Sequence, residues 1–302
     1  MGSFVRRPGM MAGVVLAGAA LTLVAPAAAA QAKTAVPGVI NVPCSVSALK
    51  TAIITANGGG AAVLALSANC TYSIVVPTSA TDALPPVTGH FGLVGGGNTV
   101  IRRGTAALSA FRVLQVASGA SLLVSNLSIR NGSTAGLGGG VLNAGTLRIR
   151  NVTFLGNKAA NGGALSNSAG STASLDNATM SGNTTTGVGG GGIINFGTLT
   201  LTQSSLSGNR VPINGGGLNT QPGGITHVIQ SQIVSNVAGG LGGGISNLGT
   251  TTISGSSVRF NKGSSGGGIA TGNTNVTLKT STVTSNRPDN CNPVHTIQGC
   301  VD

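Results

Sequence analysis

Acidic and aromatic residues are scarce in this chain of 302 residues, which has four Asp, no Glu, no Trp and one Tyr. A conventional enzyme cleft is hard to build without carboxylates and aromatic walls. Charged residues make up 7% of the chain and apolar residues 40%, so a core can form and intrinsic disorder is excluded. The 51 Gly lie in clusters and not at every third position, which excludes collagen. The composition predicts a regular, thin-cored fold of one or two domains.

Long apolar runs are missing after the first 30 residues. Within them, Arg6 and Arg7 precede an apolar run over 10–25, and Pro26 and four alanines follow. This order of basic, apolar and small residues is typical of a secretory signal peptide cleaved near Ala30. A membrane anchor is the alternative, but the run is short for a span. We expect a secreted protein without a membrane span in the mature chain, exported by the general or the twin-arginine route.

The mature chain has four cysteines and no C-x-x-C pair. Cys44 and Cys70 lie near one end, and Cys291 and Cys300 near the other. An even number of cysteines in an oxidising compartment favours disulfides, so we predict one bond within each of these pairs. Free buried thiols are the alternative. The three histidines are scattered, which disfavours zinc, and we expect no metal and no cofactor.

An internal repeat is the strongest signal in the sequence. An Asn recurs with gaps of 26, 26, 26, 27, 25 and 25 residues, and a Gly-Gly-(Gly/Ala) triplet recurs in step with it. From the second of these Asn onward, the residues three and eight positions before it are apolar, and the residue five before it is small. The recurring residues are Asn131, Asn157, Asn183, Asn209, Asn236, Asn261 and Asn286.

Alternation of apolar and polar residues predicts three short strands in each repeat, one after the Gly triplet and two before the Asn. A helical repeat is disfavoured, because each Gly would destabilise it by about 1 kcal/mol. Equivalent residues would stack roughly 4.8 Å apart in parallel strands, which is a parallel β-helix of about ten coils. Gly and Asn suit its corners because both tolerate positive φ. We predict an additional amide ladder at Asn151, Asn177, Gln203 and Gln230.

The looser sequence upstream continues this pattern. Segments 91–101, 111–116 and 122–129 are expected to be earlier coils, and 46–56 an amphipathic helix that caps the open N-terminal edge. The predicted organisation is a signal peptide at 1–30, an N-terminal segment with the capping helix at 31–60, the β-helix at 61–290 and a disulfide-closed C-terminal tail at 291–302.

Two motifs carry a resemblance to known proteins. The stretch from Gly190 to Asn195, together with Phe-x-x-Asn from Phe154 to Asn157, resembles the repeat of polymorphic outer-membrane proteins. Nearly all of the chain after residue 40 resembles the exported right-handed parallel β-helix proteins of the pectate-lyase-like superfamily. The resemblance implies an all-β, right-handed single solenoid. It does not select a function, because that group contains lyases, hydrolases and adhesins.

Catalytic constellations are not evident in the sequence. The four carboxylates, Asp82, Asp176, Asp289 and Asp302, are far apart, whereas β-helix glycosidases and lyases need clustered acids. Asp176 falls in the same column as Arg150 one coil earlier, which predicts an ion pair. The match of Gly263-x-Ser265-x-Gly267 to a hydrolase motif is expected by chance in Gly/Ser-rich sequence, and no helix follows it. We therefore expect no catalytic residues and a protein that is not an enzyme.

Positive charge is the better functional signal. Without residues 1–30 the chain has 14 basic and four acidic residues, a net charge of +10. Four cations directly follow a recurring Asn, and in register they form a column along one corner. Such a column can follow an acidic polysaccharide or a cell-wall polymer, without specific recognition of nucleic acid. The alternative is that the charges only keep this corner soluble. The four residues are Lys158, Arg210, Lys262 and Arg287.

The sequence therefore predicts a secreted, non-catalytic surface, structural or adhesin-like β-helix protein. One alternative is a polysaccharide-active lyase or hydrolase of the pectate-lyase-like superfamily. Another is an ice- or carbohydrate-binding solenoid, because Thr198, Thr200, Thr250 and Thr252 project from one face. Thr is also simply a good strand residue, and His227 interrupts the array. The ligand and the oligomeric state are left open.

Overall fold

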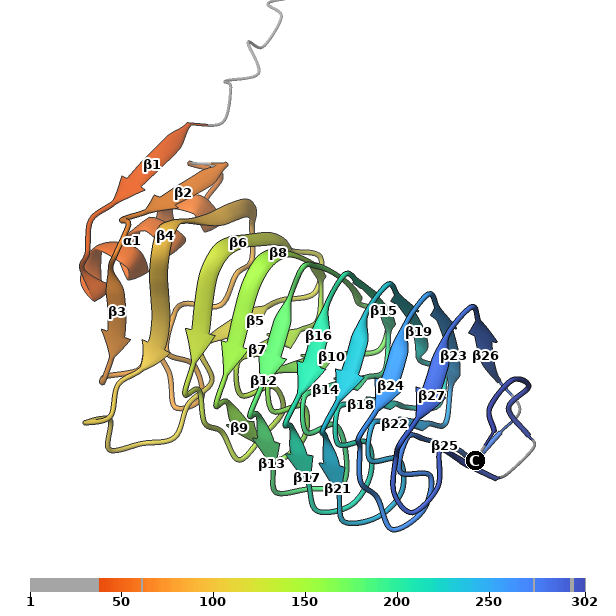
Figure 1. Cartoon of the computed structure of the whole chain (residues 1–302). Helices are drawn as coiled ribbons and strands as arrows, with labels where there is room; N and C mark the ends of the chain where they lie inside the picture. The colour runs from red at the N-terminus through yellow and green to blue at the C-terminus, as the bar shows by residue number, and fades with distance from the viewer. Residues whose placement is uncertain (1–37, 61, 274, 294–295, 302) are drawn as a thin grey trace, which may run out of the picture. The chain divides into compact units, whose positions relative to one another are not determined.

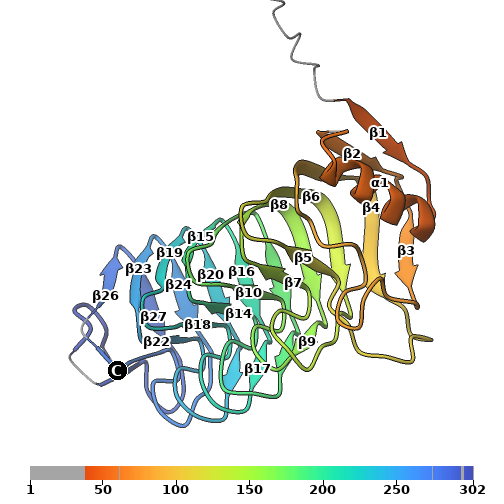
Figure 2. The same ribbon diagram turned by 180° about the vertical axis from the view of Figure 1, so that it is seen from behind.

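The computed structural model describes residues 38–60, 62–273, 275–293 and 296–301, so the predicted signal peptide lies outside the described residues. The described chain winds into a parallel β-helix of about ten coils, as the repeat predicts (Figures 1 and 2). Within these ranges the regular structure consists of 28 strands and one helix. Its strands stack in three parallel sheets of 16, 8 and 4 strands.

The three sheets form the walls of the coil. The first sheet consists of β1 (Val39–Val42), β2 (Val63–Leu66), β3 (Thr71–Ile74), β4 (His90–Arg103), β6 (Ser121–Arg130), β8 (Thr146–Leu155), β11 (Thr172–Asp176), β12 (Thr179–Ser181), β15 (Thr198–Thr202), β16 (Ser205–Ser207), β19 (Ile225–Ile229), β20 (Gln232–Val234), β23 (Thr250–Ser254), β24 (Ser257–Arg259), β26 (Val276–Lys279) and β27 (Thr282–Thr284). The second consists of β5 (Leu114–Val116), β7 (Val141–Asn143), β10 (Leu165–Asn167), β14 (Ile193–Asn195), β18 (Leu218–Thr220), β22 (Ile245–Asn247), β25 (Ile269–Thr271) and β28 (Cys291–Asn292). The third consists of β9 (Lys158–Ala159), β13 (Thr184–Thr185), β17 (Arg210–Val211) and β21 (Val237–Ala238).

The three strands predicted for each repeat are present in the coils that end at Asn183 to Asn286, and in the coil that ends at Asn157 the last two are joined as β8. The two before the recurring Asn belong to the first sheet, where β11 and β12 are separated at Asn177, a residue with φ of 49°. The strand after the Gly triplet belongs to the second sheet. Several coils add a fourth strand directly after the recurring Asn, which the prediction missed. This strand is only two residues long, so no alternation of apolar and polar residues reveals it.

The interior of the coil is filled by the apolar columns of the repeat. Phe154, Met180 and Leu206 stack in register on consecutive coils, and each is fully buried. Full burial of one such side chain stabilises the fold by roughly 1.5–3 kcal/mol relative to exposure. The small residues five positions before the Asn, such as Ala178 and Ser204, are also buried. The core is therefore thin but continuous along the solenoid.

A ladder of buried amides runs along one inner corner, and we call it the Asn ladder. Asn183 illustrates the repeating unit: its Oδ1 accepts hydrogen bonds from the backbone N of Asn157 at 2.9 Å and from Asn157 Nδ2 at 3.0 Å. Its Nδ2 donates to the carbonyl oxygen of Phe154 at 3.2 Å and to Asn209 Oδ1 at 2.9 Å. Both polar atoms of a fully buried amide are thus satisfied. The members are Asn157, Asn183, Asn209, Asn236, Asn261 and Asn286.

Asn131 is not a member of the Asn ladder, so its assignment as the first recurring residue is wrong by one position. The bridge between Ser133 and Lys158 places Gly132 opposite Asn157, and Gly132 N donates to Asn157 Oδ1 at 3.0 Å. Asn131 is exposed, with φ of 58°, and occupies the left-handed corner position that Gly156 takes one coil later. The two positions are adjacent and both favour Asn, so residue type alone does not distinguish them.

The additional amide ladder is only partly as predicted. All four predicted residues occupy a left-handed corner on the outer surface, with φ between 46° and 53°. Asn177 Nδ2 donates to Asn151 Oδ1 at 2.8 Å, and Asn151 Nδ2 donates to Asn126 Oδ1 at 3.0 Å. The hydrogen-bonded ladder therefore extends upstream to Asn126. Within the described residues, Gln203 and Gln230 keep the corner conformation without joining the hydrogen-bonded series.

The Gly triplets are required by close packing within and between coils. Gly190 has φ of 65°, and a Cβ there would lie 2.2 Å from the carbonyl oxygen of Ile193. At Gly191 a Cβ would lie 2.4 Å from the carbonyl oxygen of Gly216 on the next coil. Neither position has room for a side chain, which explains why the triplet recurs in step with the coils.

The N-terminal end of the solenoid is closed by the predicted capping helix, α1 (Val46–Asn57) (Figure 1). Ser45 caps the helix, and Leu49 and Ile53 on its inner face are fully buried. The predicted Cys44–Cys70 disulfide ties the start of the helix to the residue before β3. The first strand, β1, precedes the helix and pairs with β2, so the sheet begins within the segment assigned to the cap.

The C-terminal tail is closed by the predicted Cys291–Cys300 disulfide. Ile297 of the tail is buried and joins the apolar core. The tail also contributes β28, which pairs with β25, so the second sheet runs a step beyond the predicted boundary at residue 290. Upstream, β4, β5 and β6 confirm the three segments that were expected to form earlier coils.

Candidate functional site

The four predicted cations occupy one outward-facing column, which we call the basic column. Each directly follows a member of the Asn ladder, so the buried amide fixes where the next side chain leaves the corner. Parallel pairing connects the positions from coil to coil, and all four cations are exposed. In coil order the column reads Lys158, Thr184, Arg210, Val237, Lys262 and Arg287.

The four cations of the basic column form no ion pair with a carboxylate of the described residues. Of the ion pairs in the described part of the chain, one joins Arg112 to Asp82 and the other joins Arg150 to Asp176. Asp289 lies near the end of the column, but its Oδ1 accepts a hydrogen bond from the backbone N of Gly267 at 3.0 Å. Among the residues described, no carboxylate lies within 4.0 Å of the four cations. Their field is therefore available to a ligand in solution.

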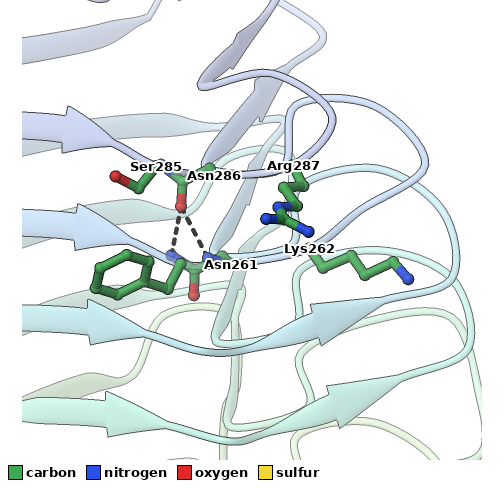
Figure 3. Close-up of a pocket in the computed structure, with 6 residues that line it drawn as sticks. Asn261, Lys262, Ser285, Asn286 and Arg287 are labelled. Carbon is green, nitrogen blue, oxygen red and sulfur yellow. Dashed lines mark hydrogen bonds between the residues drawn. The ribbon is translucent and has the colours of Figure 1, made fainter.

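The C-terminal end of the basic column opens into a pocket of about 570 Å³, the terminal pocket. Lys262 and Arg287 lie on the same side of the corner, beside the hydrogen bonds that join Asn261 to Asn286 (Figure 3). Phe260 lines the same pocket with 55% of its surface exposed. The guanidinium carbon of Arg259 lies 5.4 Å from the centre of the Phe260 ring, a cation–π contact. The pocket thus combines an apolar ring with two cations that form no ion pair with a carboxylate of the described residues. Its lining is completed by Ser285.

Apolar side chains line the loops that follow the basic column on three consecutive coils. Val188 is 55% exposed, and Ile213 and Leu241 are each 43% exposed. Asn214 N donates to the carbonyl oxygen of Val188, and Gly240 N donates to that of Ile213, so Val188 and Ile213 are equivalent residues and Leu241 lies one position later. We call these three residues the apolar row. The basic column and the apolar row make this edge of the solenoid both charged and apolar.

The buried pair of Asp82 and Arg112 was missed by the sequence analysis. Arg112 Nη1 lies 2.8 Å from Asp82 Oδ1, and both side chains are over 90% buried. Arg112 also donates to the side-chain oxygen of Gln115 and to the carbonyl oxygen of Leu137, so three segments are held together. The only sequence signal was a separation of 30 residues, close to one coil. Because its charges are paired with each other and hydrogen-bonded within the protein, we assign this site a structural role in the irregular N-terminal coils.

A second groove, of about 400 Å³, lies on the outer face of the first sheet. Arg148, Arg150 and Asp176 line it, beside Phe91 and Leu123. The predicted ion pair is present here, with Arg150 Nε 3.7 Å from Asp176 Oδ2. Both side chains are well exposed, at 69% and 43%, so the pair is weak. Asp176 and Asp289 are separated by about four coils, on the order of 20 Å, which is too far for a carboxylate pair.

The remaining candidates are distributed over the surface. Parallel register places His227 between Thr200 and Thr252 in one outward column, as predicted, and Ile225 between Thr198 and Thr250 in another. The Thr array is thus interrupted on the same coil in both columns. Ser265 lies in a loop bridged to Leu241, and no helix follows it in the described residues.

Three further findings concern metal binding, membrane-spanning helices and similarity to known proteins. In the described ranges, no three His, Cys, Asp or Glu side chains are grouped so as to hold a metal ion. The helix that the structure describes, α1, is too short to cross a membrane. No protein-family model, no curated protein and no solved structure matches this chain.

Proposed function

We propose that this protein is a secreted, non-catalytic surface protein that binds acidic polymers along the basic column. The observation that carries the proposal is the placement of four exposed cations in one column with no described carboxylate within 4.0 Å. An extended polyanion can contact several cations of such a row together, and its attraction to the row adds over the contacts.

The scaffold supports this function because it holds the cations in place without using their charge. The Asn ladder and the Gly triplets determine the corner, so the side chains one position later are free to vary. The two disulfides support an oxidising, extracellular environment. Export through the signal peptide at 1–30 and membership of the pectate-lyase-like superfamily belong to the same proposal, and an adhesive or structural role at the cell envelope fits both.

The test is retention of the mature protein on immobilised acidic polymers over a series of salt concentrations. The variant Lys158/Arg210/Lys262/Arg287→Gln removes the basic column. We expect retention of the native protein to fall as salt rises, and retention of the variant to be lost at low salt already, because ionic contacts dominate such binding.

The matched control removes the same charge elsewhere. Arg102, Arg130, Arg148 and Lys279 lie outside the basic column, so Arg102/Arg130/Arg148/Lys279→Gln has the same net charge as the test variant. We expect this control to keep most of the retention. Equal loss in both variants would reduce the proposal to a general effect of net charge, and unchanged retention in the test variant would overturn it.

A further inference from the structure

The cations of the basic column alternate with uncharged residues. Thr184 separates Lys158 from Arg210, and Val237 separates Arg210 from Lys262. Coils of a parallel β-helix are spaced by roughly 4.8 Å, so these three cations are about 10 Å apart at the backbone. Both intervening residues are half-buried and in the same register as their charged neighbours. The gaps are therefore positions where a cation fits but none is present.

This spacing is wider than the charge spacing of most biological polyanions. Each strand of a nucleic acid carries one phosphate per roughly 3.4 Å of axis, so most phosphates would face no cation of the column. A polyuronate that has a carboxylate on every sugar ring also presents charges at about the distance between single coils. An extended disaccharide, in contrast, is comparable in length to two coils. One anion per disaccharide places successive charges opposite Lys158, Arg210 and Lys262.

The apolar row points to the same class of ligand. Val188, Ile213 and Leu241 are exposed in the loops that follow Thr184, Arg210 and Val237 of the column on consecutive coils, and Phe260 is exposed in the terminal pocket. Sugar rings have apolar C–H faces that pack on aliphatic and aromatic side chains, whereas a polyphosphate chain has no such surface. The uncharged sugar of each disaccharide would contact this apolar surface between two cations.

We infer that the ligand of the basic column is an acidic polysaccharide in which charged and uncharged sugars alternate. This inference rests on the proposed function and makes it specific. The terminal pocket, where Lys262 and Arg287 lie on adjacent coils, is the one place in the described column where two cations are close together. It would hold one end of the bound segment.

The most discriminating test moves one positive charge of the basic column to a neighbouring coil and keeps the net charge constant. In the exchange variant Thr184→Arg/Arg210→Thr, the net charge is conserved but the two-coil spacing is lost. Binding is measured with two probes, hyaluronan, which has one carboxylate per disaccharide, and polygalacturonate, which has one per sugar. We expect the affinity for hyaluronan to fall about threefold to fivefold, the size of one exposed ion pair, while the affinity for polygalacturonate stays within about twofold.

A second variant fills the gaps. Thr184→Lys/Val237→Lys places a cation on every coil from 158 to 287, and both positions lie in a column that accepts Lys and Arg on the neighbouring coils. We expect the affinity for polygalacturonate to rise several-fold more than that for hyaluronan, which has no anion opposite the new lysines. The control Thr198→Lys/Thr250→Lys adds the same charge on another face.

The outcomes separate the two proposals. If the quadruple Gln variant still binds both polymers, the basic column is not the binding surface and both proposals fail. If that variant loses binding while the exchange and gap-filling variants change both affinities by equal factors, the column binds polyanions without regard to spacing. The inference about alternating sugars then fails, and the proposed function stands. Circular dichroism of each variant confirms that the β-helix is intact.

Discussion

Two neighbouring columns of the same corner differ in almost every physical respect. The Asn ladder faces inward, has the same residue on six consecutive coils, and uses its amide groups fully. The basic column, one residue later, faces outward and reads Lys, Thr, Arg, Val, Lys and Arg. Repetition therefore indicates support of the fold. Variation at a position that the fold leaves free is where a binding function can be placed.

The strongest challenge to this comparison is the removal of one inner amide. Asn209→Ala leaves the backbone N and Nδ2 of Asn183 without their acceptor and the carbonyl oxygen of Met180 without its donor. Because each unsatisfied buried polar group costs about 1–3 kcal/mol, we expect the free energy of unfolding to fall by about 3–5 kcal/mol. Urea denaturation followed by circular dichroism measures it. A loss below about 1 kcal/mol would mean that the ladder is not a principal support.

A smaller effect is expected one residue before the ladder, at the left-handed corner. Gly208 has φ of 62°, and a Cβ there would meet no atom closer than 4.0 Å. The cost of Gly208→Ala is therefore conformational only, about 1 kcal/mol. The same urea experiment tests this value. Phe260, Ser235 and Ser285 occupy this corner position on other coils, so Ser235→Gly is expected to stabilise the fold by a similar amount. A destabilising Ser235→Gly would contradict this account of the corner.

One residue after the ladder, stability and binding should separate. Arg210 is exposed and has no described ion-pair partner, so Arg210→Gln is expected to change the free energy of unfolding by less than about 0.5 kcal/mol. The same variant should weaken retention on an acidic polymer at low salt. A combined urea and retention experiment compares Arg210→Gln directly with Asn209→Ala. The contrast would disappear if the outward substitution destabilised the fold as much as the inward one.

The smallest effect is expected on the other outer face, at the pair of Arg150 and Asp176. Its 3.7 Å separation and high exposure predict that Arg150→Gln costs between 0 and about 0.5 kcal/mol. Thermal unfolding at low and at high salt measures this contribution, and any difference should vanish at high salt because the pair is screened. A salt-independent loss would instead indicate that Arg150 packs as part of the fold.

Much of the fold was predictable because its determinants are local and repeated. Alternation located the inward columns, such as those of Phe154 and Leu206, and the repeat then implied parallel stacking. Placement of the four cations in one column followed from the same register. The offset at Asn131 was not predictable, because two adjacent corner positions both favour Asn and residue type does not distinguish them. The two-residue strands were not predictable, because they are too short to show an alternation of apolar and polar residues.

The candidate site also has a part that the sequence predicted and a part that it did not. Lys158, Arg210, Lys262 and Arg287 were assigned from spacing alone, and the structure places them in one exposed column. The terminal pocket was missed because the periodicity does not show that Phe260, at the corner position before Asn261, is exposed and lines one pocket with Lys262 and Arg287. Thr184 and Val237 could be recognised as uncharged positions of the basic column only from the strand register of the structure.

The sequence by itself determined the period, the direction of each strand side chain, the helical cap and the pairing of the cysteines. These depend on alternation and on residues that recur at the distance of one coil, so neighbouring coils specify one another. Only the tertiary structure decided the buried pair of Asp82 and Arg112, the terminal pocket and the apolar row. The buried pair and the apolar row lie in irregular segments outside the strands, where packing and not the repeat sets the contacts. The terminal pocket depends on the corner position before the Asn ladder, whose residue type changes from coil to coil.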